Sequence, residues 1–460
     1  MIFRIFNQYI PSRKIALVAC ESLFICGVLL ISTEAFSRVP IGPGHPLARA
    51  ALITILIQIT FYYCDLYDLK VFRTRWELLT RLPQALGAAT IALALIYFLF
   101  PELMIGRGIF LSSLPLIAFA ALAWRSAYIG VLSARDLNQN VLIIGTGPLA
   151  RSIAAEILHR ADSGFKVSGF VSGDSNMLGR SIVNPRVLGG FEQIEELSAA
   201  HRISRIVVAA EERRSAYPLQ QLLECKMKGI LVEDGIEFYE HLTGKIKIED
   251  LHPSALIFSE GFRQNRWTAA SKRAIELLLS LAVLVLLFPV LLVIALIIRT
   301  DSPGPVFYRQ LRAGKGGKPF ELLKFRTMVP DAEKDGPVWA AVKDARITRS
   351  GKWLRESRMD EIPQLVNVIR GDMSFVGPRP ERPHFTGLLA ERIPYYAQRF
   401  RVRPGVTGWA QVRYRYGASV EDAAEKLRYD LYYIKNLSLS FDLYIIFETL
   451  KIVFFGKGAR

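Results

Sequence analysis

The chain has 460 residues, which at about 150 residues per domain corresponds to roughly three units. Half of the residues (51%) are apolar and the mean hydropathy is +0.25, which excludes an intrinsically disordered chain and predicts membrane segments. The formal charge of +16 predicts phosphate-bearing partners: nucleic acid, anionic lipid or nucleotide-linked substrates. The four cysteines lack the spacing of metal ligands, so neither a disulfide framework nor a structural zinc site is expected.

Four apolar stretches fill the first third of the chain, and each approaches the ~20 residues that a helix needs to cross a ~30 Å hydrocarbon core. Cations are densest before the first stretch and between the second and third, where Lys70 and Arg73 lie. This pattern predicts four crossings with both ends in the cytoplasm, over residues 1–135. Glu21 and Arg125 lie within or near these spans, and each is expected either to face the bundle interior or to reach a helix end. The stretches are Ile15–Ile31, Ala48–Tyr63, Leu82–Phe100 and Ile109–Leu132.

Residues 136–250 have the pattern of an α/β domain. Short apolar runs alternate with helical segments, which predicts a doubly wound parallel sheet of the Rossmann-like type. The first run ends in a GxGxxA turn with Gly145 and Gly147, and Asp174 follows the second run. These three residues are candidates for binding a nucleotide. The turn alone is weak evidence, so we prefer a degenerate domain with a regulatory or scaffolding role.

After a linker at 251–271, the 25 residues from Ala274 to Ile298 are almost entirely apolar. A straight helix of this length would cross a membrane, but both flanks are basic, whereas a spanning helix should show asymmetry. Pro289 also interrupts the run and should kink the helix. A broken, re-entrant helix that enters and leaves by one face accounts for both features, while a fifth span stays open from the residues alone.

The last third of the chain carries most of the charge: residues 299–460 hold 29 Lys and Arg against 18 Asp and Glu, or +11. Adjacent carboxylates at Asp360 and Glu361 lie in this cationic segment. One could act as a nucleophile while the other holds a divalent cation, because carboxylates and substrate phosphates are the usual ligands of Mg²⁺. The alternative is a capped helix start with acids in the first turn and Pro363 just inside it.

Three further cationic elements surround this pair in sequence. The first is a Gly/Lys loop at 314–318, which alone is more typical of a solvated turn than of a phosphate site. In the second, Pro378 and Pro380 stiffen the backbone around Arg379, which presents a guanidinium suited to a phosphate or a carboxylate. In the third, cations and aromatics alternate from Arg399 to Trp409, as expected for a nucleotide contact or for a membrane-facing edge.

The motifs KFRTM (324–328), DEIPQL (360–365), GDMSFVGPRP (371–380) and RPGVTGWAQV (403–412) follow one another in this order behind the apolar helix. Together they resemble the bacterial sugar transferase family, the monotopic polyprenyl-phosphate phosphoglycosyl transferases, over about Thr268–Arg460. The preceding membrane helices and Rossmann-like module resemble the large form of that family, and the C-terminal segment resembles its exosortase-associated subgroup. Met359 and Val366 depart from the usual residues without touching the carboxylates.

This resemblance implies transfer of a hexose-1-phosphate from a UDP-sugar to undecaprenyl phosphate, with release of UMP. By the motif match, Asp360 would attack the β-phosphorus and form a covalent aspartyl-phosphosugar intermediate, and Glu361 would help to hold Mg²⁺. The reaction would be the first membrane step of exopolysaccharide biosynthesis. Candidate substrate-binding residues are Lys324, Arg326, Arg355, Pro378, Arg379 and Pro380.

The resemblance also implies a mainly α-helical, monotopic catalytic domain over residues 272–460, with the segment 274–298 re-entrant and broken at Pro289. The protein would then be a multi-pass protein of the cytoplasmic membrane that contacts membrane lipid, with the catalytic domain on the cytoplasmic face. A homodimer is expected, and nucleic acid is no longer expected as a partner. No motif reports which sugar is transferred.

Two other readings use the same domain layout. A membrane-anchored, NAD-dependent nucleotide-sugar dehydratase or epimerase generally needs a Tyr-x-x-x-Lys pair, and no lysine in this chain has Tyr four residues before it. A non-catalytic scaffold for polysaccharide assembly would use the acidic pair only as a helix cap. Both are kept as alternatives to the transferase.

Overall fold

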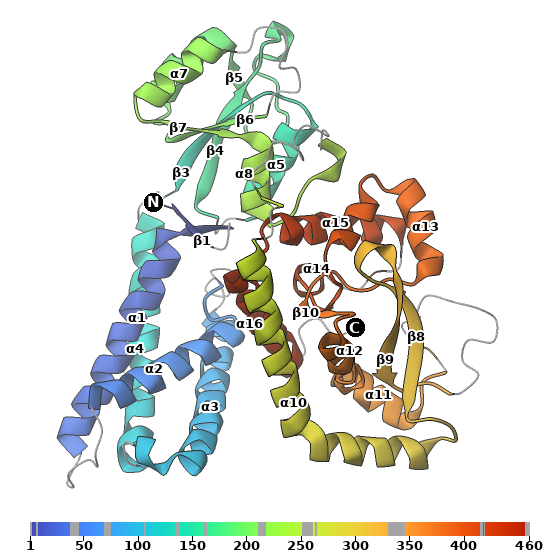
Figure 1. Cartoon of the computed structure of the whole chain (residues 1–460). Coiled ribbons are helices and arrows are strands. Elements are labelled where there is room, and N and C mark those ends of the chain that lie inside the picture. The colour runs from blue at the N-terminus through green and yellow to red at the C-terminus, as the bar shows by residue number, and fades with distance from the viewer. Residues whose placement is uncertain are drawn as a thin grey trace. The chain divides into compact units, whose positions relative to one another are not determined.

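The computed structural model divides into two compact units, Met1–Gly235 and Ile236–Arg460, which are treated separately below (Figure 1). The loop cations Lys70 and Arg73 used in the topology prediction lie outside the residues that the structure describes. The structure describes the whole chain except residues 1, 6–7, 37–45, 69–74, 105–106, 135–137, 161–162, 210–217, 251–260, 263–264, 330–343, 345, 415–416, 418 and 456–460.

After a short N-terminal hairpin, the first unit continues with four helices rich in apolar residues, as predicted. Glu21 and Arg125 form a buried ion pair inside this bundle, because Nε and Nη2 of the arginine lie 2.8 and 3.1 Å from the two carboxylate oxygens. Of the two predicted orientations, the interior one is therefore observed. The helices are α1 (Ser12–Phe36), α2 (Pro46–Tyr63), α3 (Arg75–Leu99) and α4 (Arg107–Ala134).

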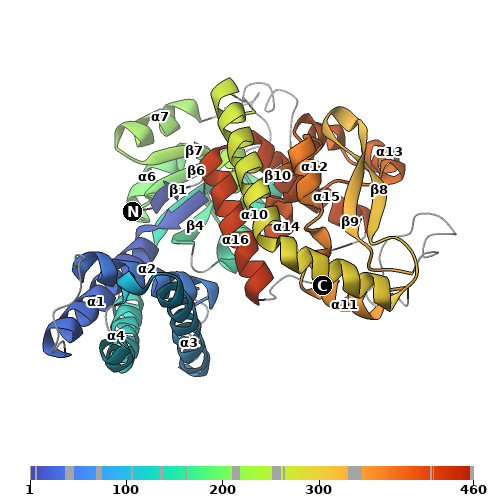
Figure 2. The same ribbon diagram turned by 60° about the horizontal axis from the view of Figure 1, so that its bottom comes forward.

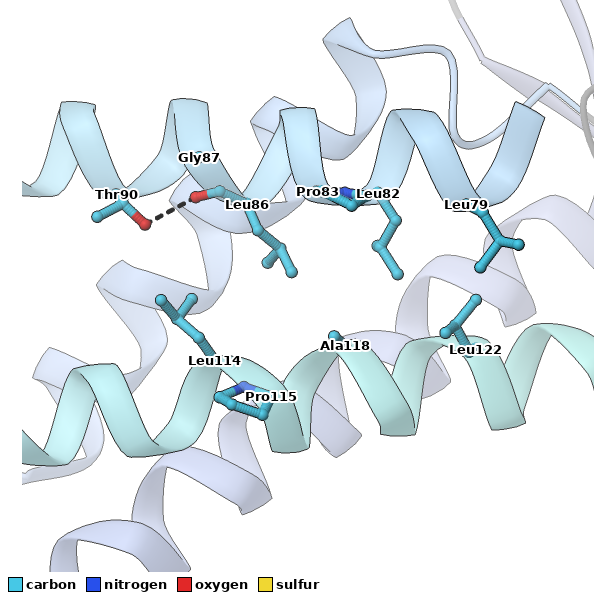
Figure 3. Close-up of a pocket in the computed structure, with 10 residues that line it drawn as sticks. All are labelled: Leu79, Leu82, Pro83, Leu86, Gly87, Thr90, Leu114, Pro115, Ala118 and Leu122. Atoms are coloured by element: carbon cyan, nitrogen blue, oxygen red, sulfur yellow. Dashed lines mark hydrogen bonds between the residues drawn. The ribbon is translucent and has the colours of Figure 1, made fainter. Parts of the chain in front are cut away.

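A cavity of about 520 Å³ separates α3 from α4 (Figure 3). Leu82 and Leu86 of α3 face Leu114 of α4 across it, and each helix carries a proline beside the cavity, Pro83 and Pro115. The lining is almost entirely aliphatic, as expected for helices in a hydrocarbon environment.

Among the residues that the structure describes, four helices are long and apolar enough to cross a membrane: α1, α2, α3 and α10, which spans Arg266–Asp301 in the second unit. Three of the four crossings predicted in the first third thus coincide with such helices. The fourth predicted stretch forms a helix, α4, and its crossing stays a prediction.

A parallel sheet completes the first unit and confirms the predicted α/β pattern. Its strands follow the order β5-β4-β3-β6-β7, so the chain starts in the middle of the sheet and fills one side before the other, as in doubly wound folds. The elements are β3 (Gln139–Ile144), α5 (Pro148–His159), β4 (Phe165–Val171), β5 (Val187–Gly189), α6 (Ile194–Ala200), β6 (Arg205–Val208), α7 (Leu219–Met227) and β7 (Leu231–Asp234).

An N-terminal hairpin of β1 (Ile2–Ile5) and β2 (Gln8–Pro11) joins α1 to this sheet. The Tyr9 hydroxyl donates to Glu233 at 2.8 Å, and the guanidinium of Arg205 lies over the Tyr9 ring. The first membrane helix is thereby tied to the sheet by side-chain contacts.

The second unit is mainly helical and has its own core around Trp409, which packs against Tyr432 and Phe441. The indole nitrogen of Trp409 donates to the Gly244 carbonyl at 2.7 Å, so the chain just after α8 belongs to this core. The elements besides α10 are α8 (Gly235–Thr243), β8 (Phe307–Ala313), β9 (Pro319–Phe325), α11 (Arg349–Glu356), η7 (Met359–Glu361), α12 (Gln364–Arg370), β10 (Ser374–Val376), α13 (Pro383–Arg392), η8 (Tyr396–Arg401), β11 (Gly405–Thr407), α14 (Trp409–Arg413), α15 (Val420–Lys435) and α16 (Leu439–Phe455).

The apolar helix α10 contains Pro289 and consists of two arms joined at a bend (Figure 1). In the first arm, Nζ of Lys272 lies 2.5 Å from Oδ2 of Asp442. Asp442 belongs to α16, which runs beside α10 (Figure 2). In the second arm, Ile298 packs against Leu354 of α11. Both ends of α10 therefore contact one and the same domain, while many of its apolar side chains between these contacts are exposed.

α16 has two different faces. Phe441 and Ile445 are buried in the core, whereas Leu443 and Leu450 are exposed. One side of α16 therefore packs in the core, and the other carries exposed apolar side chains.

Strands β10 and β11 pair in parallel through an unusually close approach of their backbones. A Cβ atom added at Gly405 would overlap the backbone nitrogen of Gly377, and one at Gly408 would overlap the Gly377 carbonyl oxygen. Only glycine fits at these contacts, which explains why both motifs of this region are rich in glycine.

We predict that Gly405→Ala destabilises the second unit by about 1–3 kcal/mol or more, because neither backbone can move aside without breaking the strand pair. Gly387→Ala is the matched control, since an added Cβ at this exposed position of α13 meets nothing within 4 Å. Thermal unfolding of the detergent-solubilised protein measures both changes. Equal melting temperatures for the two variants would contradict the packing described.

Candidate active site

The acidic pair lies in η7, a short 3₁₀ turn between α11 and α12. Arg358, just before it, has a left-handed backbone conformation with φ of 55°, which is uncommon for a residue with a Cβ and turns the chain out of α11. Pro363 follows the turn and serves as the N-cap residue of α12. Asp360 and Glu361 therefore lie before α12. The helix-cap alternative placed both acids in the first turn of a helix with Pro363 just inside it, and the structure differs from that arrangement.

Glu361 is bound by two cations from distant parts of the chain. Its Oε1 accepts a hydrogen bond from Nζ of Lys324 on β9 at 2.8 Å and from Nη2 of Arg379 at 2.9 Å. Burial alone would raise the pKa of Glu361, but the charges of Arg379 and Lys324 outweigh it and hold the pKa below its ordinary value. This carboxylate is therefore ionised at neutral pH.

Asp360 is buried, with 8% of its surface exposed. Desolvation raises its pKa above the ordinary value, against the opposing charge of Lys324 and with a further contribution from the neighbouring Glu361. Two adjacent acids thus have pKa values pushed in opposite directions. Active sites use this separation to give two carboxylates different roles.

The cations around the pair can also bind anionic oxygens. Lys324, Arg355 and Arg379 each lower the pKa of Asp360, so all three charges are felt at the nucleophile candidate. A carboxylate among several cations is suited to attack at a phosphorus, because the cations offset the charge of the phosphate oxygens as they approach. The arrangement favours phosphoryl-transfer chemistry.

Arg379 makes a second contact that the sequence did not identify. Its Nη1 donates to Oε1 of Gln411 on α14 at 2.7 Å. The only local signal for Gln411 is its place in the RPGVTGWAQV motif. Arg379 thus bridges Glu361 and α14.

Asn367 also escaped the sequence analysis. Its amide nitrogen donates to the Glu321 carbonyl at 2.7 Å, and its amide oxygen accepts from the Leu323 backbone nitrogen at 3.0 Å. These bonds fasten α12 to the edge of β9 and so fix Lys324 relative to the acidic pair. A polar residue within the apolar run 365–369 was the available signal.

Arg355 and Arg326 have different positions. Nε of Arg355 donates to Thr327 at 2.9 Å, close enough to the pair for its charge to act on Asp360. Arg326 points elsewhere, because its Nη2 donates to the Ser302 carbonyl at 2.7 Å at the C-terminal end of α10. Helix C-termini have unpaired carbonyls and attract cations. The structure brings Lys324, Arg355 and Arg379 together but gives Arg326 a capping contact.

The two remaining cationic elements of the sequence are the Gly/Lys loop at 314–318 and the segment from Arg399 to Trp409. The Gly/Lys loop is the exposed turn of the β8–β9 hairpin, with Gly316 and Gly317 at positive φ. In the third element, Arg399 is buried against Asp430, whereas Arg401 and Arg403 are exposed.

Residues 267–456, which contain this site, match the family model described as bacterial sugar transferase. A relative named UDP-glucose:undecaprenyl-phosphate glucose-1-phosphate transferase, from Caulobacter vibrioides, is 44% identical over 183 residues, covering 39% of this chain and 68% of the relative. The chain belongs to the bacterial sugar transferase family.

Two other relatives are matched over longer segments. The UDP-N-acetylgalactosamine-undecaprenyl-phosphate N-acetylgalactosaminephosphotransferase of Aeromonas hydrophila is 41% identical, over 52% of this chain and 56% of the relative. The undecaprenyl-phosphate glucose phosphotransferase of Komagataeibacter xylinus is 32% identical, over 71% of this chain and 61% of the relative. The chain therefore spans less than two thirds of the length of either relative.

Residues 63–221 also match a family model described as CoA-binding domain. Gly145 and Gly147 lie between β3 and α5, and Gly147 is the N-cap residue of α5. The carboxylate of Asp174 accepts a hydrogen bond from the Asn176 backbone nitrogen at 2.9 Å. Asp174 is therefore the N-cap residue of the short 3₁₀ turn Ser175–Met177. Nucleotide binding by these three residues stays a prediction.

A magnesium site was predicted at Glu361. Among the residues described, no group of three His, Cys, Asp or Glu side chains is placed to hold a metal ion. The carboxylates of Asp360 and Glu361 are nonetheless hard oxygen ligands of the kind that Mg²⁺ takes together with substrate phosphates. Both cations described at Glu361 bind Oε1, so Oε2 can serve as a ligand.

Proposed function

We propose that this protein transfers a hexose-1-phosphate from a UDP-sugar to undecaprenyl phosphate, giving undecaprenyl-diphosphate-sugar and UMP. The observation that carries the proposal is the buried Asp360 beside a Glu361 that Lys324 and Arg379 keep ionised. The names of the relatives support the substrate classes, since each contains undecaprenyl phosphate and a sugar phosphotransferase activity.

In the first step, a carboxylate oxygen of Asp360 forms a bond to the β-phosphorus of the UDP-sugar. The bond from that phosphorus to the bridging oxygen breaks, and its electron pair leaves with UMP. The aspartyl-phosphosugar that remains divides one difficult displacement into two. Arg379 and Lys324 bind the phosphate oxygens and offset the charge that builds up on the leaving UMP.

In the second step, a phosphate oxygen of undecaprenyl phosphate attacks the same phosphorus. The aspartyl–phosphorus bond breaks, its electron pair returns to Asp360, and the lipid-linked diphosphate sugar is released. Burial favours both steps, because excluding water protects the acyl-phosphate intermediate from hydrolysis.

We infer that Glu361, with the substrate diphosphate, holds the Mg²⁺ that this reaction uses. When bound, the ion would neutralise charge on the diphosphate and on the departing UMP. Lys324 and Arg379 both bind Oε1 of Glu361 and hold the carboxylate in place, while Oε2 would be the oxygen that binds the ion.

The proposed path of α10 is re-entrant, broken at Pro289. Lys272 near its start and Ile298 near its end both contact the catalytic domain, and two ends bound to one domain do not suit opposite sides of a bilayer. The exposed apolar side chains between them suit immersion in one leaflet. We place this domain on the cytoplasmic face of the inner membrane, where nucleotide sugars are made.

The strand order of the first unit supports a Rossmann-like domain, to which we assign a regulatory or scaffolding role. We further propose that the reaction is the first membrane step of exopolysaccharide biosynthesis. The relatives name both glucose and N-acetylgalactosamine, so the choice of hexose stays open. A homodimer stays a prediction.

Replacing the nucleophile tests the mechanism. We predict that Asp360→Asn lowers UMP release by roughly 10³-fold or more in membranes given UDP-sugar, Mg²⁺ and undecaprenyl phosphate, because the amide cannot form the intermediate. Glu356→Gln, an exposed carboxylate four residues earlier, is the control and should retain activity. Normal turnover by Asp360→Asn would exclude Asp360 as the nucleophile.

The pH dependence tests the electrostatics of the pair. Only ionised Asp360 attacks, so single-turnover UMP release without acceptor should fall as the pH drops through its raised pKa. Lys324→Met removes a charge that lowers this pKa, and the acid limb should therefore move to higher pH. Lys324→Arg, which keeps the charge, should leave the limb near its wild-type position. An unmoved limb in Lys324→Met would contradict the described field.

Cysteine labelling tests the path of α10. With the four native cysteines replaced, Ser271→Cys and Arg309→Cys flank the helix at exposed positions. In spheroplasts, neither should react with an impermeant maleimide until the membrane is opened. Glu102→Cys, in the exposed turn between α3 and α4, should react from outside and serves as the control. Labelling of one flanking cysteine from outside would establish a spanning helix.

A further inference from the structure

The turn that presents Arg379 is held by its carbonyl groups. Pro378 and Pro380 have no backbone N–H, so two of its residues cannot be anchored by backbone donation. Instead, four successive carbonyls each accept a hydrogen bond from outside the turn. The pairs are Pro378 with the Gly405 backbone nitrogen at 2.9 Å, Arg379 with the Arg399 guanidinium at 2.9 Å, Pro380 with the Arg312 guanidinium at 3.0 Å and Glu381 with the Ala313 backbone nitrogen at 2.8 Å.

The bond at the Arg379 carbonyl itself comes from a buried arginine. Arg399 is 6% exposed, and the Nη2 that donates to this carbonyl also lies 2.9 Å from Oδ2 of Asp430 on α15. Its Nη1 donates to the Tyr396 hydroxyl at 2.7 Å. Asp430 and Tyr396 are buried too, at 1% and 2% exposed.

A buried ion pair contributes little to stability by itself, since desolvating two charges offsets most of their attraction. It does fix the direction of a planar guanidinium, because the carboxylate and the phenol together leave one orientation for the fork. Here that orientation aims one N–H at the backbone of Arg379.

We propose that Arg399, oriented by Asp430, is a positioning residue for Arg379. This inference rests on the proposed function. Arg399 is too deeply buried to touch a substrate, whereas the Arg379 side chain is 37% exposed and contacts Glu361. The chain of contacts runs from Asp430 through Arg399 to the Arg379 backbone, and from the Arg379 guanidinium to the carboxylate beside the nucleophile. A buried pair on α15 and η8 thereby sets the position of a phosphate-binding cation.

A loss of activity on replacing Arg399 has two explanations, positioning of Arg379 and general support of the fold, and these can be distinguished. A residue that acts through Arg379 loses its effect once the Arg379 guanidinium is gone, whereas a residue that merely supports the fold keeps its effect. A double-mutant cycle on kcat/KM for UDP-sugar measures this difference. It compares Arg399→Met, Arg379→Met and the double variant with the wild type.

We expect Arg399→Met to lower kcat/KM by about 10- to 100-fold, the range for small displacements of a catalytic group, and to cost less than about twofold in the Arg379→Met background. Arg399→Lys keeps the charge opposite Asp430 but lacks the planar fork. It should fold with a melting temperature near that of the wild type and still show the coupled loss, which covers the case in which Arg399→Met does not fold.

Lys245→Met is the matched control. Nζ of Lys245 lies 2.7 Å from Oε1 of Glu425 in a partly buried ion pair, and Glu425 is on α15, the helix that also carries Asp430. It should lower stability without a loss that depends on Arg379. Equal losses from Arg399→Lys in the wild-type and Arg379→Met backgrounds, or no loss in either, would overturn the positioning role. Absence of UMP release by the wild-type protein would instead contradict the proposed function, and the positioning role with it.

Discussion

The contact of Glu361 with Lys324 and Arg379 holds the catalytic domain's site together. Lys324 comes from β9 and Arg379 from the turn after β10, so one carboxylate joins three separate segments of chain. The two cations keep Glu361 ionised, while burial raises the pKa of its neighbour Asp360. These two adjacent acids, in a segment with a net charge of +11, can therefore carry different chemical roles. Two carboxylates in water would lack this difference in pKa.

The membrane-associated helix and this site share their supports. Glu276 of α10 accepts a hydrogen bond from the Phe375 backbone nitrogen at 3.1 Å, and Lys272 donates to the Val376 carbonyl at 3.2 Å. Both contacts fall on β10, the strand that leads into the Arg379 turn. In the proposed function, these contacts would couple the depth of α10 in the bilayer to the height of the site, as a reaction between a soluble nucleotide sugar and a lipid phosphate requires.

The acidic pair, the stiffened turn at Arg379 and the proline inside the apolar helix are visible in local sequence patterns, whereas Lys324 became a candidate only through the family motif that contains it. Local patterns did not identify Gln411, Asn367 or the pairing of Arg399 with Asp430, since each depends on contacts between segments far apart in sequence. The contact of Arg326 with the end of α10 was missed for the same reason, since Ser302 lies 24 residues earlier, and substrate binding by Arg326 stays a prediction. The parallel sheet was predictable from alternation, whereas the left-handed turn at Arg358 carries no glycine and gave no signal.

In the proposed mechanism, Asp360 forms a covalent bond to the transferred phosphosugar. Intact-mass and peptide mass spectrometry of the protein, quenched with UDP-sugar and Mg²⁺ present and undecaprenyl phosphate withheld, tests this most directly. We expect an added mass of one hexose phosphate on the peptide that contains Asp360, lost when undecaprenyl phosphate is supplied. UMP release in step with lipid product, with no adduct at any time of quenching, would contradict the two-step mechanism.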